Sequence, residues 1–184
     1  MIVNDMELRQ RVEALEPAAL AEIYDAYAPK IYSYVYHRTG NGALAEDLTS
    51  DVFVRMLEAV RDDRGWNTSL QGWLYRIAHN LVVDHFRRAS KRDGVELDER
   101  WMAAESYTAT FEGLFHSNQL RIGMRFLTGE QQQVVMLKFV EGLSNGEVAE
   151  IIGKTEGAVK ALQHRALSAL RRVVGVESQV EAEL

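Results

Sequence analysis

The sequence predicts an all-α fold of two small helical domains joined by an acidic linker, the C-terminal one a helix-turn-helix. Three observations support this prediction. Apolar residues recur at the 3.6-residue period of amphipathic helices along most of the chain. No sustained period-two alternation, the pattern of a half-buried strand, is present. The chain has 184 residues, which suffices for one ordinary domain or two small ones, since domains commonly hold about 100–200 residues.

The composition excludes several classes of protein. With 47% hydrophobic and 26% charged residues, the chain is typical of soluble globular proteins, and it has no run of about 18 apolar residues that would span a bilayer. The N-terminal residues lack an apolar stretch behind a basic one, so we expect a cytoplasmic protein without membrane insertion. The sequence contains no cysteine, which excludes disulfides and thiolate metal sites.

The sequence shows no catalytic or metal-binding pattern. No nucleophile–base pairing, paired-carboxylate motif or phosphate-binding glycine loop is present. We therefore expect no enzyme, no metal and no cofactor. The histidines lack the spacing of a zinc site and are interpreted as surface or half-buried residues; they are His37, His79, His85, His116 and His164.

The first third of the chain predicts two amphipathic helices. The first runs from about Pro17 to Arg38, and a breaker cluster at 39–42 separates it from the second. The second ends near Val60 and has an acidic outer face. The predicted apolar faces are Leu20, Ile23, Tyr24, Tyr27, Ile31, Tyr34 and Val35, then Leu44, Leu48, Val52, Met56, Leu57 and Val60.

A third helix is predicted from Ser69, a plausible N-cap, to about Lys91. Its apolar stripe would be buried, whereas its other side carries more positive charge than solubility requires. This excess favours a polyanion partner. The stripe comprises Leu70, Trp73, Leu74, Ile77, Leu81 and Val82, and the basic residues are Arg76, Arg87, Arg88, Lys91 and Arg92.

The charge then changes sign, and residues 93–118 are interpreted as an acidic linker. The formal net charge of −6 is therefore an average over acidic and basic blocks, and local patches set the contact with a polyanion. After the linker, Thr128 and Gln131 form a capping box for a helix that runs to about Glu141. The expected core face of that helix comprises Val134, Val135, Leu137 and Val140.

The C-terminal third predicts a helix-turn-helix. Ser144 and Glu147 form a second capping box, Gly153 suits the left-handed end of that helix, and Thr155 caps the next. Such a second helix can enter the major groove of DNA. The alternative is a plain helical hairpin whose basic face is solvated. The buried stripe would be Val159, Leu162, Ala166 and Leu170, leaving Glu156, Lys160, Ala161, His164 and Arg165 outward.

Two stretches together resemble the conserved regions of bacterial sigma factors. Conserved region 2 is resembled by two stretches in succession, LAEDLTSDVFVRMLEAV (44–60) and LQGWLYRIAHNLVVDHFRR (70–88). Conserved region 4 is resembled by LTGEQQQVVMLKFVEGLSNGEVAEIIGKTEGAVKALQHRAL (127–167). Their order matches the extracytoplasmic function (ECF) group. The resemblance implies a region 2-like domain at 1–92, the linker at 93–118, a region 4-like domain at 119–174 and an acidic, frayed tail at 175–184.

The resemblance implies a non-enzymatic initiation factor that binds core RNA polymerase and promoter DNA. The first domain would bind the β′ clamp coiled coil, recognise the −10 element and help to melt it, with a flipped base captured by the loop at 64–69. Contacts to the β subunit and an anti-sigma factor are also implied. The implied polymerase contacts are Glu46, Asp47, Asp51, Phe53 and Arg55, and the implied −10 contacts are Trp66, Asn67, Asn80, Asp84, Arg87 and Arg88, with Trp73 in the core.

The second domain would recognise the −35 element through the second helix of its motif. The family pattern is close to V-K-S-R-L-H-R-A-R, and this chain departs from it at Ala161 and Leu162. The −35 preference of typical members therefore does not transfer. Glu156 either caps the helix or reads a cytosine amino group. The implied −35 contacts are Thr155, Glu156, Lys160, His164 and Arg165.

Two other functions remain open at this point. A LuxR-like regulator would share the helix-turn-helix but would not bind core polymerase stoichiometrically. A helical adaptor or anti-sigma-type partner would need no DNA contact. For the acidic linker we expect passage between the two domains inside polymerase, where its charge mimics nucleic acid.

Overall fold

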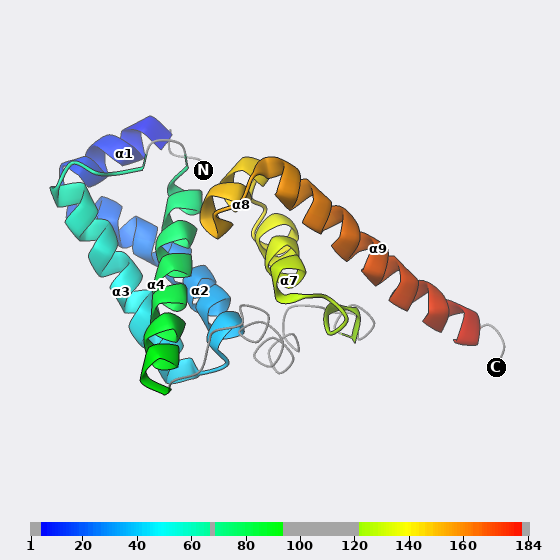
Figure 1. Cartoon of the computed structure of the whole chain (residues 1–184). Coiled ribbons are helices and arrows are strands. Elements are labelled where there is room, and N and C mark those ends of the chain that lie inside the picture. Colours follow the sequence, from blue (N-terminus) through cyan, green and yellow to red (C-terminus); the bar gives the residue numbers. More distant parts are fainter. Residues whose placement is uncertain (1–4, 67–68, 94–121, 182–184) are drawn as a thin grey trace.

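The computed structural model describes residues 5–66, 69–93 and 122–181, and within these ranges it contains helices and no strand. The prediction of an all-α fold is confirmed. Four helices form the N-terminal part: α1 (Asp5–Glu13), α2 (Pro17–Thr39), α3 (Gly42–Arg61) and α4 (Leu70–Asp93). In Figure 1 these four lie together, with α4 between α3 and the C-terminal helices. Residues 94–118 of the expected linker, and Asn67, lie outside the described residues.

Local signals set the ends of the N-terminal helices. Pro17 occupies the first turn of α2, where its missing N–H costs nothing. Gly40 ends α2 in the left-handed conformation, with φ 63°. The Asn41 side chain then accepts a hydrogen bond from the Leu44 amide and starts α3. Ser69 caps α4 in the same way through the Gly72 amide, so these boundaries agree with the predicted ones. Helix α1 has no counterpart in the prediction.

The C-terminal part consists of α7 (Gly129–Val135), its π-helical continuation η2 (Met136–Val140), α8 (Asn145–Ile152) and α9 (Glu156–Glu181). Both predicted capping boxes are formed, one at Thr128 and one at Ser144. Gly153 ends α8 with φ 66°, as the helix-turn-helix requires. Helix α9 continues past the helix end expected near Val174, because the single Gly175 costs only about 1 kcal/mol in a helix interior.

The larger hydrophobic core extends through both parts of the chain. It joins buried residues of α2, α3 and α4 to buried residues of the C-terminal helices, among them Val134, Leu137, Val148 and Ile151. A smaller core lies within the C-terminal part and includes Met124, Leu127, Val135, Met136, Ala166 and Leu170. The segment formed by α7 and η2 therefore has two apolar sides, one for each core, where the sequence predicted a single face.

One predicted core residue lies at the surface. Tyr24 is 50% exposed, while Ile23, Ile31 and Tyr34 of the same helix are at most 1% exposed. The prediction that Tyr24 belongs to the apolar face of α2 is wrong, because its position falls at the edge of that face. Its ring rests against Phe53 of α3, with centroids 4.8 Å apart, and leaves the other side to solvent.

Candidate nucleic-acid interface

The outer face of α3 presents acidic side chains to solvent. Glu46, Asp47, Asp51 and Arg55 are all exposed. Phe53 differs from them, because it is 6% exposed and packs against Tyr24. Four of the five residues that the sequence assigned to a polymerase contact are therefore available to a partner, and Phe53 supports the helix from inside.

The loop before α4 carries a buried tryptophan. Trp66 is 3% exposed, and its ring lies 5.8 Å from the ring of Trp73. The Arg9 guanidinium of α1 lies over the same ring, 5.9 Å from its centroid, at the range of a cation–π contact. Trp73 is 9% exposed, so its assignment to the core is confirmed. In this arrangement Trp66 belongs to the core as well, and stacking on a flipped base would require it to turn outward.

The C-terminal half of α4 is a basic, solvent-facing surface. Asn80, Arg87 and Arg88 are exposed and Asp84 is half-buried. Arg87 forms its ion pair with Asp84 at 3.6 Å, one turn away, which leaves the positive charge at the surface. Such guanidinium groups can bind phosphates, which position a protein on nucleic acid.

The second helix of the helix-turn-helix has one buried and one exposed side. Val159 and Ala166 are fully buried, and Leu162 and Leu170 are each 8% exposed, so the predicted stripe is confirmed. The opposite side is solvent-facing throughout its first three turns. Its exposed residues are Thr155, Glu156, Lys160, His164 and Arg165.

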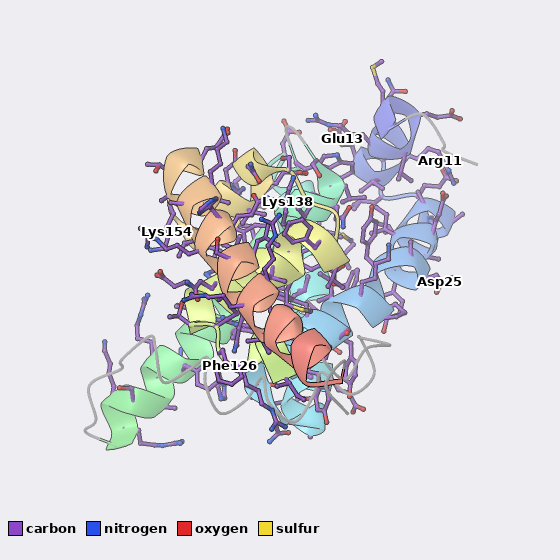
Figure 2. All side chains as sticks on the ribbon, turned by 90° about the vertical axis from the view of Figure 1, so that its right-hand side faces the viewer. Arg11, Glu13, Asp25, Phe126, Lys138 and Lys154 are labelled. Atoms are coloured by element: carbon purple, nitrogen blue, oxygen red, sulfur yellow. The ribbon has the colours of Figure 1, made fainter. Side chains whose placement is uncertain are left out.

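The start of this helix is fixed by side chains. Thr155 Oγ1 accepts a hydrogen bond from the Ala158 amide at 3.2 Å, so Thr155 is the cap. Glu156 pairs with Lys160 at 3.8 Å. Lys154, in the turn, binds Glu130 of α7 at 2.7 Å and ties the motif to the helix before it. Figure 2 views the molecule from the side of α9, with Lys154 near the start of that helix.

A polar network that the sequence did not predict joins the two parts of the chain. The Gln133 amide lies 2.8 Å from His79 Nδ1 and 3.3 Å from the Tyr34 hydroxyl. Arg38 donates to the side-chain oxygen of Gln133, Oε1, at 3.3 Å. In the sequence, the only feature that could indicate this network is a glutamine, Gln133, next to the apolar run Val134–Leu137. That feature does not predict which residues Gln133 contacts, because they lie 54 to 99 positions away in the chain.

A second set of polar contacts joins α4 to the segment after η2. Gln71 donates to the Glu141 backbone carbonyl at 2.8 Å, and the Tyr75 hydroxyl donates to the Glu141 carboxylate. The Ser69 and Ser144 side chains lower the pKa of the Glu147 carboxyl in α8, against the opposing effect of burial. Arg76 and Glu150 form an ion pair at 3.7 Å on the exposed rim. The N-terminal half of α4 therefore meets the C-terminal part through alternating polar side chains.

Burial shifts the pKa values of several side chains at and near this interface. Burial, with the Arg38 charge as a second cause, lowers the pKa of His79 to about 4. Burial also lowers the pKa of His37 to about 4. Burial raises the pKa of the Glu141 carboxyl, against the opposing effects of the Tyr75 hydrogen bond and the Lys30 charge. Both histidines are therefore neutral near pH 7.

The described residues hold no group of three or more acidic, histidine or cysteine side chains that would bind a metal ion. Among the same residues, no helix combines the length and apolar character needed to cross a membrane. What the described surface offers is an acidic helix face and two basic helix faces.

Comparison with known proteins identifies both parts of the chain. Residues 23–92 match the family model of Sigma-70 region 2, and residues 123–172 match that of Sigma-70 region 4. The chain is 30% identical to the ECF RNA polymerase sigma factor SigW of Bacillus subtilis, over 91% of this chain and 97% of the relative. It is 38% identical to the ECF RNA polymerase sigma factor BldN of Streptomyces coelicolor, over 92% of this chain, and spans 65% of that relative's length.

A solved structure shares the fold. The sigma factor RpoE, crystallised with the anti-sigma factor NepR from Bartonella quintana, is 20% identical. It covers 85% of this chain and 96% of its own, with a TM-score of 0.62.

Proposed function

The chain belongs to the ECF group of RNA polymerase sigma factors, and on this basis we propose that it binds core RNA polymerase and directs promoter recognition, DNA melting and transcription initiation. It carries out no covalent chemistry of its own and acts by binding. Its place of action is the cytoplasm, where polymerase and promoter DNA are found.

The basic end of α4 and the loop before it bind the −10 region in this proposal. Exposed Arg87 and Arg88 supply phosphate contacts, and exposed Asn80 can form hydrogen bonds with a base edge. A flipped base costs a few kcal/mol to extrude, and stacking on an aromatic side chain recovers about 1–3 kcal/mol. Trp66 is the aromatic group at hand, once it has turned out of the core.

The exposed side of α9 reads the −35 region. Lys160 and Arg165 lie on the outward face that follows a capped turn, which is the geometry of a recognition helix in the major groove. Ala161 and Leu162 offer no hydrogen-bond donor there, and Leu162 is buried. Base readout therefore falls to His164, Arg165 and the first turn of the helix.

The acidic face of α3 binds polymerase. Glu46, Asp47 and Asp51 are exposed on one helix, and such a face is complementary to a basic surface on the partner, which favours association and orientation. An anti-sigma factor is a further partner that group membership suggests, and it would compete for the same surfaces.

The observation that carries the proposal is the recognition face of α9, because it is exposed, basic and supported by a buried stripe within a region 4 match. The test is run-off transcription with core polymerase on a genomic promoter library. We expect specific transcripts that depend on the protein, and the recovered promoters also give the sequences it recognises.

A matched pair of variants makes this test specific. Lys160→Ala should weaken binding to all promoters and reduce the slope of the salt dependence by about one unit, as expected for one lost phosphate contact. Arg165→Ala should weaken binding and also reduce the discrimination between promoters, because a base contact is lost. Arg125→Ala removes an exposed charge outside the helix-turn-helix and should change neither promoter binding nor its salt dependence. Failure of the wild-type protein to form a stoichiometric complex with core polymerase in the absence of DNA would contradict the proposal and favour a LuxR-like regulator.

A further inference from the structure

Helix α1 lies outside the residues that match the region 2 model, which begin at residue 23. It is nevertheless fixed to the bundle, where it packs against α2 and α3. Val12 is fully buried, and the Arg11 guanidinium forms two hydrogen bonds with the Glu16 carboxylate, at 2.9 and 3.0 Å. A further hydrogen bond of 3.4 Å joins Arg11 to Glu22 of α2. These contacts define the position of α1 on the bundle.

One side chain of α1 reaches the loop before α4. In Figure 1, α1 lies across the end of the bundle where the chain passes from α3 to α4. The Arg9 guanidinium lies over the Trp66 ring, 5.9 Å from its centroid, and Arg9 Nε donates to the Glu13 carboxylate at 2.7 Å. Trp73 of α4 contacts the same indole ring, with centroids 5.8 Å apart. Trp66 is thus held in the core by α1 as well as by α4.

We propose that Arg9 is a positioning residue for the capture of the flipped −10 base, because it sets how readily Trp66 leaves the core. This inference rests on the proposed function, in which Trp66 turns outward to stack on that base. Arg9 itself does not touch the base and acts through the Trp66 ring.

Two contributions stabilise the inward orientation of Trp66. The Arg9 guanidinium is attracted by the negative face of the indole π system. Trp66 is also 3% exposed, so an outward turn exposes the apolar surface of its ring to water. Stacking on a base therefore draws on a minor population in which Trp66 points outward, and the apparent affinity for the base is reduced by that fraction. Loss of the Arg9 charge removes the first contribution and leaves the second.

The expected size of the effect follows from the exposure of the cation. The Arg9 side chain is 38% exposed, which places the contact among the weaker, solvent-accessible cation–π pairs. Such a contact changes an equilibrium about two- to fivefold. Its removal should therefore raise the outward population of Trp66, and with it the affinity for an unpaired −10 base, by about the same factor.

Binding of single-stranded DNA to the complex of this protein with core polymerase tests the role of Arg9. The probe is a fluorescent oligonucleotide with the non-template −10 sequence of a promoter recovered by run-off transcription, and fluorescence anisotropy gives its Kd. Arg9→Met keeps the apolar length of the side chain and removes the charge. We expect it to bind the oligonucleotide about two- to fivefold more tightly than the wild-type protein does. Gln10→Ala, at an exposed position of the same helix, is the matched control and should leave the Kd unchanged.

A double-mutant cycle shows whether Arg9 acts through Trp66. Trp66→Leu keeps an apolar side chain at the buried position but has no ring for a cation or a base to contact. In a chain that carries Trp66→Leu, Arg9→Met should therefore leave the Kd unchanged. Arg9→Lys keeps a cation near the ring and should stay within about twofold of the wild-type protein. A purely structural role of Arg9 would neither raise the affinity nor make the effect depend on Trp66.

Unchanged or weaker binding by Arg9→Met would overturn the inference, and so would the same gain in affinity in the Trp66→Leu chain. In either case a wild-type protein that binds core polymerase and gives specific transcripts leaves the proposed function intact. A wild-type protein that neither joins core polymerase nor gives it any affinity for the oligonucleotide would instead contradict the proposed function.

Discussion

The two sides of α4 differ in what they bury. One side carries apolar residues such as Leu74, Ala78 and Val82, which are fully buried where α4 packs with α2 and α3. The other side carries Gln71, Tyr75 and His79, which hydrogen-bond to the C-terminal part. The apolar side has no alternative partner and holds the bundle together. The polar side can exchange its hydrogen bonds for hydrogen bonds with water, so each of its contacts contributes less to stability.

Removal of apolar packing from α4 should change the free energy of unfolding more than any of the other changes considered below. Leu74→Ala leaves a cavity at a fully buried position and should lower the free energy of unfolding by about 2–5 kcal/mol. Urea denaturation followed by circular dichroism measures it. The matched control is Val54→Ala, at a position 51% exposed, which should change stability by about 0.5 kcal/mol or less. Equal effects of the two variants would contradict the assignment of the apolar side.

Acid should weaken the hydrogen bonds that the polar side of α4 forms with the C-terminal part. The pKa of His79 is about 4 in the folded protein and about 6.5 in the unfolded chain, so the unfolded chain takes up the proton first. The stabilisation is complete above about pH 6.5 and is lost as the pH falls towards 4, by on the order of 3 kcal/mol. Among the described residues, Arg38, Tyr34 and Gln133 face His79, and none of these three is a carboxylate that would favour the protonated form.

Urea denaturation at a series of pH values measures this loss. His79→Gln should flatten the dependence of the unfolding free energy on pH between 6.5 and 4. The remaining dependence comes from His37, whose pKa is also about 4, and from Glu141, whose raised pKa acts in the opposite direction. If the unfolding free energy of the variant depends on pH as that of the wild-type protein does, His79 is not the group whose protonation destabilises the fold.

A single hydrogen bond across the polar side should have the smallest effect. Gln71→Ala removes the donor to the Glu141 backbone carbonyl and should weaken the contact between α4 and the C-terminal part by about 1 kcal/mol. The loss can be measured in a chain carrying Gly72→Cys and Glu147→Cys, because a Cβ at position 72 would lie 3.5 Å from the Glu147 Cβ, within the range of natural disulfides. In that chain Gln71→Ala should lower the equilibrium constant for disulfide formation against glutathione about fivefold. Gln10→Ala, at an exposed position in α1, serves as the control, and an equal fall in both would argue against a role for Gln71.

Helix ends were predictable because the signals that set them are local. Each of these signals forms hydrogen bonds only with residues up to four positions away. They are the capping boxes at Thr128 and Ser144, the N-cap at Ser69 and the left-handed Gly153. The exposed faces of α3 and α9 followed from periodicity for the same reason. Helix α1 was missed because its nine residues offer only a weak apolar pattern.

The burial of Trp66 and Phe53 and the partners of Gln133 were not predictable from the sequence. Each depends on which helices pack side by side, and no short-range pattern carries that information. Gln133 contacts residues of α2 and α4 that lie 54 to 99 positions earlier in the chain. The hydrophobic core that joins residues of both parts was likewise not predictable from the sequence.

The most direct test of the proposed function is whether the protein assembles with core RNA polymerase in the absence of DNA. Analytical gel filtration of the wild-type protein with core polymerase should show a one-to-one complex, and that complex should initiate transcription on the recovered promoters. A protein that elutes apart from core polymerase would contradict the proposed function.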